Sequence, residues 1–192
     1  MRVTDDRYTR DRMRLDLALR LIRHEARTHT IRGWTGLSDD RIRKLYRSYV
    51  AESSDSAVKR HRGKSPRQAA YFLRNAEIRR QAATLATLLC LLGMIDRDSR
   101  PRLATVPDMQ WGEIFCRIYE TYTRLFPEPA LSFEHACHLQ RVLVQQRELG
   151  LDECSRCGAL IVVSTFAPRG LRCDFCSTES RHPGAGRGAD GC

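Results

Sequence analysis

Two pairs of cysteines near the end of the chain have the spacing of metal ligands. Cys154 and Cys157 form one C-x-x-C pair, Cys173 and Cys176 form another, and fifteen residues separate them. Two thiolates at i and i+3 in a tight turn hold one side of a tetrahedral ion, and Gly158 gives the first turn its backbone freedom. Because four sulfur ligands leave no position for water or substrate, the spacing predicts one structural zinc ion per chain.

Two other uses of paired cysteines are weaker interpretations. A pair of disulfide bonds requires an oxidising compartment, and residues 1–7 lack the apolar core of a secretory signal. A redox-active C-x-x-C is a single pair at the start of a helix, whereas here two pairs flank an apolar, β-branched stretch at residues 160–163. The sequence therefore favours structural zinc in a cytoplasmic protein.

The neighbouring cysteines and histidines are not expected to extend this site. Cys90 lies in a leucine-rich stretch, which predicts a small buried apolar residue, and Cys116 and Cys137 lie in helical patterns. His135 and His138 are spaced i, i+3, which is one metal-ligand pattern, but ordinary helix-surface histidines are the favoured interpretation.

Positive charge is concentrated in the first part of the chain. The formal net charge of the 192 residues is +10, and residues 1–80 hold 21 Lys and Arg against 10 Asp and Glu, while the remainder holds 12 against 13. A concentrated basic surface most often binds the phosphates of nucleic acid, because the release of counterions gives a large affinity that does not depend on the base sequence. An anionic membrane is the competing partner, but the apolar stretch at residues 82–95 is too short and too polar to span a bilayer.

Residues 28–49 have the pattern of a helix-turn-helix. Gly36 suits the turn, and Ser38 is a predicted N-cap for the second helix. Apolar residues flank the turn or face inward: Ile31, Leu37, Ile42 and Leu45. Arg32 departs from the motif, because it stands four positions before Gly36, where a small residue lets the helices pack closely.

Basic side chains on the second helix are the candidate DNA contacts. They are Arg41, Arg43, Lys44 and Arg47. From the major groove, such side chains reach phosphate oxygens and guanine edges. The alternative is a solvated basic helix in an ordinary bundle, and the charge asymmetry favours DNA.

A second basic cluster lies in residues 51–67, which lack apolar periodicity and predict a loop. Its candidate DNA-binding residues are Lys59, Arg60, Arg62 and Lys64. Contact with a second stretch of phosphate backbone and a solvated linker are equally good interpretations of this composition.

The remaining pattern predicts a mainly α protein with a small zinc-ribbon-like unit after it. Helices are expected at the following positions: about residues 8–29, 65–93, 108–126 and 132–149. Residues 160–166 and 171–173 are expected to form the two strands of a zinc ribbon. The predicted organisation is a helical domain at 1–150, a four-cysteine zinc-binding unit at 151–177 and a disordered tail at 178–192.

Taken together, these motifs resemble the FlhC family, a subunit of the bacterial flagellar master transcriptional activator. The resemblance covers most of residues 13–176, and its motifs are the following: Leu17–Arg27, Thr35–Ser38, Arg41–Tyr46, Arg62–Gly63 with Pro66, and the two C-x-x-C pairs. It implies a mostly helical protein whose zinc ligands are the four cysteines. It also implies a hetero-oligomer with FlhD that binds duplex DNA at flagellar promoters and recruits RNA polymerase.

Two other classes of function compete with this one. An RNA-binding or ribosome-associated zinc-ribbon protein also suits basic charge and zinc, but the basic half offers few aromatic residues for stacking on bases. An enzyme is not expected, because the acidic residues are scattered and no Ser/His/Asp or Cys/His constellation stands out.

Overall fold

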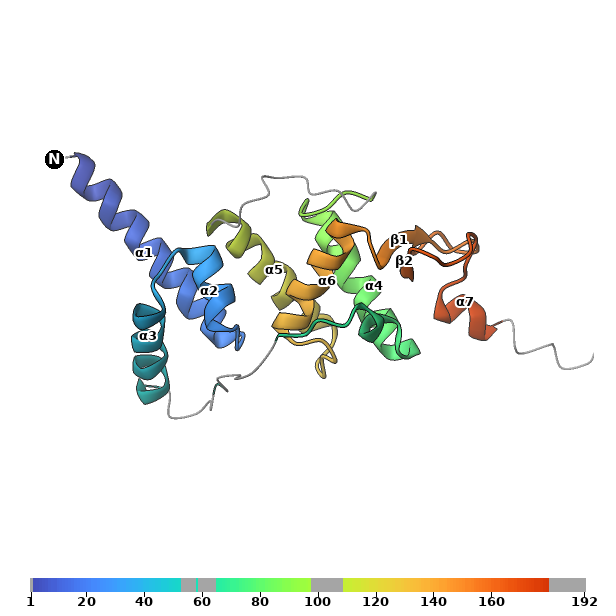
Figure 1. Cartoon of the computed structure of the whole chain (residues 1–192), viewed down its shortest axis with the longest axis horizontal. Helices are drawn as coiled ribbons and strands as arrows, with labels where there is room; N and C mark the ends of the chain where they lie inside the picture. Colours follow the sequence, from blue (N-terminus) through green and yellow to red (C-terminus); the bar gives the residue numbers. More distant parts are fainter. Residues whose placement is uncertain (1, 53–57, 59–64, 98–108, 180–192) are drawn as a thin grey trace, which may run out of the picture.

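The computed structural model describes residues 2–52, 58, 65–97 and 109–179, and in these residues the protein is mainly helical with one small sheet. The elements are α1 (Arg2–Arg23), α2 (Thr28–Thr35), α3 (Asp39–Glu52), the 3-10 helix η1 (Ala69–Leu73), α4 (Ala76–Leu91), α5 (Met109–Leu125), α6 (Phe133–Gln145), β1 (Leu149–Glu153), β2 (Leu160–Ser164) and α7 (Asp174–Glu179). The molecule is elongated: α1, α2 and α3 lie at one end, α4, α5 and α6 form the middle, and the strands and α7 lie at the other end (Figure 1). No helix in the described ranges is long and apolar enough to cross a membrane.

The first three helices pack on one another around a small set of apolar side chains. Ile31 of α2 and Ile42 of α3 are fully buried, and the hydroxyl of Tyr46 donates to the carbonyl of Ala26 over 2.8 Å. α1 ends six residues before the predicted position, because Glu25 adopts a left-handed conformation (φ 58°) that stops the helix. These helices are called the three-helix region (residues 2–52) below.

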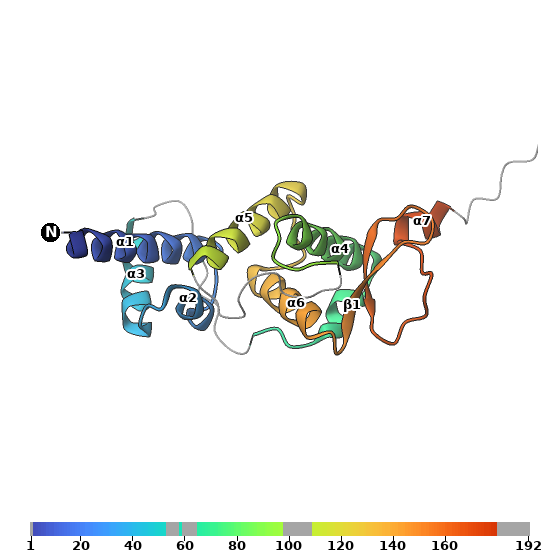
Figure 2. The same cartoon turned by 90° about the horizontal axis from the view of Figure 1, so that it is seen from above.

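Helix α5 joins the three-helix region to the middle of the molecule. Its aromatic side chains Phe115 and Tyr122 are fully inaccessible, and burial of each such side chain contributes about 1.5–3 kcal/mol. Gly112 permits a close approach to α1 and α2, because a Cβ there would lie 2.7 Å from Leu17 Cδ2 and 3.0 Å from Trp34 Cε3. The order of elements along the long axis is also visible from above (Figure 2).

Two predicted helices have different limits. The single helix expected at 65–93 is wrong: the chain forms η1, breaks at Arg74 and Asn75, and then forms α4. Asn75 is extended and its side chain accepts from the N–H of Ile78 over 2.8 Å, so it starts a new helix. The last helix begins after Ser132 as predicted, but ends at Gln145, because Gln146 adopts a left-handed conformation (φ 50°). Leu149 and Gly150 belong to β1 instead.

The strand arrangement also differs from the prediction. β2 pairs antiparallel with β1, with Leu151 opposite Val162, whereas residues 171–173 form no strand and α7 follows them. The predicted division at residue 151 therefore falls within β1. The predicted tail at 178–192 begins with two residues of α7, and from residue 180 onward it lies outside the described residues. Residues 149–179 are called the cysteine unit below.

Candidate metal centre and basic helix

The first cysteine turn follows directly from the end of β1. Gly158 has φ +71°, a conformation that L side chains rarely adopt, and its N–H donates to the carbonyl of Cys154 over 2.9 Å. The N–H of Cys154 in turn donates to the carbonyl of Ala159 over 2.8 Å. These two bonds close the turn and place Cys154 and Cys157 on the same side of it.

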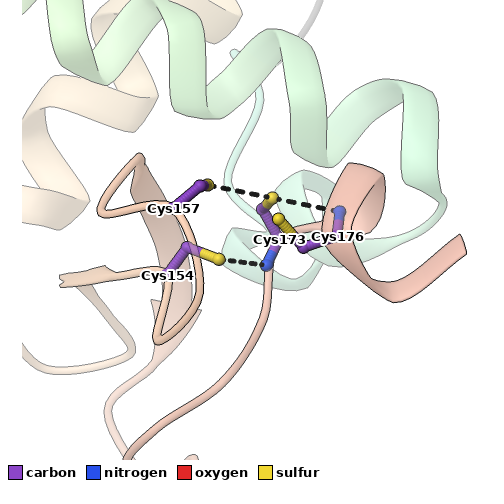
Figure 3. A group of neighbouring side chains, drawn as sticks. All are labelled: Cys154, Cys157, Cys173 and Cys176. Atoms are coloured by element: carbon purple, nitrogen blue, oxygen red, sulfur yellow. Dashed lines mark hydrogen bonds between the residues drawn. The ribbon is translucent and has the colours of Figure 1, made fainter. Parts of the chain in front are cut away.

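The second cysteine turn is the start of α7. Cys173 precedes the helix and Cys176 lies in its first turn, where the N–H of Cys176 points to the sulfur of Cys173 over 3.4 Å. The two turns also contact each other, because the N–H of Cys173 donates to Cys154 Sγ over 3.2 Å (Figure 3). A backbone hydrogen bond from Ser155 to the carbonyl of Leu171, 2.9 Å long, strengthens this contact.

The four sulfur atoms converge on one point. All of them lie within 4.8 Å of one another, and Cys157 Sγ is 3.7 Å from Cys173 Sγ. A tetrahedral ion with metal–sulfur bonds of about 2.3 Å requires sulfur atoms roughly 3.8 Å apart. The predicted ligands Cys154, Cys157, Cys173 and Cys176 are therefore positioned to bind a metal ion.

The pKa values of Cys154 and Cys176 are shifted in opposite directions. The N–H of Cys173 lowers the pKa of Cys154 to about 6, so this thiol ionises near neutral pH. Burial raises the pKa of Cys176 to about 12, and hydrogen bonds with the neighbouring thiols and the charge of Cys154 act in the same direction. A divalent cation supplies a counter-charge to all four thiolates, so metal binding and thiol deprotonation are linked.

The cysteine unit is packed on the helical part of the molecule. Cys154, Ile161 and Cys176 form a small apolar cluster of their own, whereas Leu149 and Val162 belong to the main core. The carboxylate of Asp174, in α7, accepts from Nε of Arg79, in α4, over 3.0 Å. The four cysteines are therefore linked to the main core through the strands and through α4.

The other described cysteines and the two histidines lie outside the metal centre. Cys116 is fully buried, and burial raises its pKa to about 12, while burial raises the pKa of Cys137 well above its ordinary value. Cys90 lies among core residues with its sulfur 3.7 Å from the carbonyl of Asp96. His135 stacks on Tyr71 with ring centroids 4.5 Å apart, and His138 is only 8% exposed. The prediction of two surface histidines is wrong for His138, because it packs against the apolar core.

The predicted DNA contacts of the second helix lie on the exposed face of α3. They are Arg41, Arg43, Lys44 and Arg47, and their side chains lie away from the core. The opposite face is buried through Ile42 and Tyr46. Arg43 Nη1 lies 2.8 Å from a carboxylate oxygen of Asp40, an exposed pair that is readily exchanged for another anion.

The connection between α2 and α3 is short and closed by glycine. Gly36 has φ +68° and its N–H donates to the carbonyl of Arg32 over 2.9 Å. Ser38 begins α3 as predicted, since its Oγ accepts from the N–H of Arg41 over 3.4 Å. Arg32 does not hinder packing, because its side chain is exposed and lies 3.4 Å from Asp39.

The second basic cluster, Lys59, Arg60, Arg62 and Lys64, lies outside the described residues. The basic face of α3 and the cysteine turns lie at opposite ends of the long axis (Figures 1 and 2). The structure therefore places the two predicted sites apart rather than combining them into one.

An ion-pair cluster that the sequence pattern did not reveal joins α1 to α5. Arg20 donates from Nε and Nη2 to the two carboxylate oxygens of Glu120, each over 2.7 Å, and also contacts Glu113. Arg20 lowers the pKa of Glu120 to about 2, while burial lowers the pKa of His24, which touches the same carboxylate at 3.1 Å. These partners are about 100 residues apart in the chain, so no local signal predicts them.

Comparison of the chain with known protein families found no family that matches, and a search of curated proteins found no matching sequence.

Proposed function

We propose that this chain is a DNA-binding transcriptional activator subunit of the FlhC type. In this proposal it acts in the bacterial cytoplasm with FlhD as a hetero-oligomer, binds duplex DNA at flagellar promoters and recruits RNA polymerase. The partner and the promoter are proposed from the sequence motifs that resemble the FlhC family. DNA binding is proposed from the exposed basic face of α3.

The arrangement of α2 and α3 supports reading DNA through a helix-turn-helix. The two helices, joined by the short turn at 36–38, pack on each other, and each buries an isoleucine in the main core, Ile31 in α2 and Ile42 in α3. The basic side chains of α3 are exposed. In this motif the second helix lies in the major groove, where arginine binds guanine edges and phosphates. The cluster at Lys59, Arg60, Arg62 and Lys64 would add phosphate contacts beside it.

The metal in this proposal is zinc, bound by the four cysteines as one structural ion per chain. Four thiolates in a closed tetrahedral set suit zinc and leave no open position for a substrate. The ion would fix the loops of the cysteine unit, which carry three arginines for further phosphate contacts: Arg156, Arg169 and Arg172. The proposed role is therefore structural, and the proposed protein is not an enzyme.

The experiment is co-expression with the FlhD of the same genome, followed by binding to a flagellar promoter fragment and a random duplex over a salt series. Zinc is quantified in the same sample. We expect a zinc-containing complex that prefers the promoter and loses affinity steeply with salt. A protein that ignores FlhD and binds all duplexes equally would refute the activator proposal.

The variant Arg43→Ala tests the placement of α3 on DNA. If Arg43 reads a base, its removal costs about 1–3 kcal/mol and relaxes specificity at one position; if it binds phosphate, all sequences weaken and the salt slope falls by about one. Arg124→Ala is the matched control, since Arg124 is exposed at the end of α5, away from α3. Equal binding by Arg43→Ala and the wild type would show that α3 does not lie on DNA as proposed.

One observation favours RNA as a second candidate ligand. Phe166 is 90% exposed and Phe175 is 71% exposed, and both lie in the cysteine unit, near arginines in the sequence. Exposed aromatic rings beside cations stack on the splayed bases of single-stranded nucleic acid. Competition between duplex DNA and structured RNA separates the two candidates: preference for RNA, lost on Phe166→Ala, would support the second.

A further inference from the structure

A single arginine of α4 reaches into the second cysteine turn. Asp174 is the residue between Cys173 and the rest of α7, and its carboxylate accepts from Nε of Arg79 over 3.0 and 3.2 Å. Nη2 of Arg79 also binds this carboxylate. The pair is therefore bidentate, which fixes the orientation of the carboxylate as well as its distance.

Arg79 is itself held in place on the main body of the molecule. Its Nη1 donates to the carbonyl of Leu73, the last residue of η1, over 3.1 Å. The backbone N–H of Arg79 donates to the carbonyl of Asn75, the N-cap of α4, over 2.9 Å. Arg79 is therefore fixed in the first turn of α4 by its backbone, and its guanidinium joins the end of η1 to the start of α7.

The position of Asp174 makes this contact relevant to the metal. Asp174 begins α7, and the first turn of that helix directs the N–H of Cys176 to the sulfur of Cys173. The first cysteine turn is anchored separately, through the strands that place Leu149 and Val162 in the main core. The two halves of the metal centre therefore reach the same body by different routes, and Arg79 is part of the second route.

We propose that Arg79 is a positioning residue for the metal: through Asp174 it holds the second cysteine turn against α4, so that the four sulfur atoms are already close before the ion binds. The inference rests on the metal-binding role proposed above. Groups that orient metal ligands without touching the ion change metal affinity by about 10- to 100-fold when they are removed. By the same contact, a bound ion stabilises the junction of η1 and α4.

The test is the rate at which the zinc-loaded full chain releases its metal to a chelating dye. Arg79→Ala is expected to release zinc at least about tenfold faster than the wild type, and Asp174→Asn similarly. The double variant is expected to be no worse than either single one, because both remove the same contact. Arg79→Lys is expected to be intermediate, since lysine keeps the charge but loses the bidentate geometry.

Arg80→Ala is the matched control, because Arg80 is the next residue of α4 and pairs with Glu77 on an exposed face. Fluorescence of Trp34 and Trp111, both packed in the helical core, shows whether each variant keeps its fold. If Arg79→Ala does not fold, Asp174→Asn is the test, because it removes the negative charge and one of the two acceptor oxygens that Arg79 binds. Zinc release at the wild-type rate in folded Arg79→Ala and Asp174→Asn would overturn the inference, whereas a wild type that binds no metal would overturn the metal proposal itself.

Discussion

The cysteine unit and the three-helix region both turn at a glycine with positive φ, Gly158 in one and Gly36 in the other, but they are held by different interactions. The three-helix region closes over fully buried side chains such as Ile31 and Ile42. The cysteine unit buries only Ile161 and two of its cysteines in a cluster of its own. Apolar burial therefore supports the three-helix region directly. The strands of the cysteine unit share the main core through Leu149 and Val162, whereas its cysteine turns depend on convergent thiols and on contacts with α4.

The largest expected difference between the two regions follows loss of the proposed metal. Cys173→Ser, or a strong chelator, is expected to abolish metal binding, whose free energy is about 10 kcal/mol or more in small zinc units. Hydrogen exchange should then become fast in peptides from 154–176 and stay slow in peptides from 28–49. Cys90→Ser is the control, since Cys90 lies outside the cluster. Loss of protection in both sets of peptides would mean that the regions do not differ in this way.

Features that depend on residues close together in the sequence could be predicted in both regions. The spacing of Cys154, Cys157, Cys173 and Cys176 is local, and ligands of one ion must converge, so the cluster was predictable without knowledge of the fold. The N-cap at Ser38 and the turn at Gly36 are likewise local signals. These parts of the prediction are confirmed by the geometry of the described residues.

The missed features depend on residues far apart in the chain. Arg79 and Asp174 are 95 residues apart, and Arg20 and Glu120 are 100 apart, so neither contact has a sequence pattern. The expected return strand at 171–173 was wrong because β1, which precedes the cysteines, takes that place beside β2. The helix break at Asn75 was missed because residues 65–68, Ser-Pro-Arg-Gln, have the local pattern of a capped helix start, which placed the start of the expected helix at residue 65. The basic residues of α3 lie on its outer face, and their role on DNA stays a prediction.

Truncating one isoleucine in each region tests where apolar burial matters most. Ile42→Ala removes a fully buried side chain and is expected to lower the free energy of unfolding by about 2–4 kcal/mol. Ile161 lies in the small cluster with Cys154 and Cys176. Ile161→Ala is expected to change the free energy of unfolding by less than about 1 kcal/mol and to weaken metal binding instead. Chemical denaturation followed by tryptophan fluorescence, and metal competition, measure the two effects. A larger loss of unfolding free energy in Ile161→Ala than in Ile42→Ala would contradict this difference between the two regions.

Acid should weaken the junction of α1 and α5 through Glu120. Its folded pKa is about 2 and its ordinary value is 4.5, so the stabilisation is complete above pH 4.5 and is lost as pH falls towards 2. Glu120→Gln is therefore expected to lower the free energy of unfolding at pH 7 by about 1–2 kcal/mol. It should also make this free energy decrease less steeply with falling pH below 4.5. Denaturation monitored by tryptophan fluorescence between pH 2 and pH 7 checks this, with Glu128→Gln, an exposed carboxylate at 128, as control. An unchanged slope below pH 4.5 would show that the ion pair with Arg20 does not stabilise the junction.

The two glycines give the finest version of the comparison. Gly36 and Gly158 have φ of +68° and +71°, and an added Cβ would meet no atom within 4 Å at either, so alanine introduces the same backbone strain of about 1 kcal/mol. In Gly36→Ala the free energy of unfolding should fall by the same amount as the strain, about 1 kcal/mol, because the turn belongs to the cooperative helical core. In Gly158→Ala the strain should appear as a roughly fivefold weaker metal affinity with an unchanged unfolding transition, because the ion holds that turn. Equal effects of the two substitutions on unfolding would mean that the cysteine unit and the three-helix region unfold together.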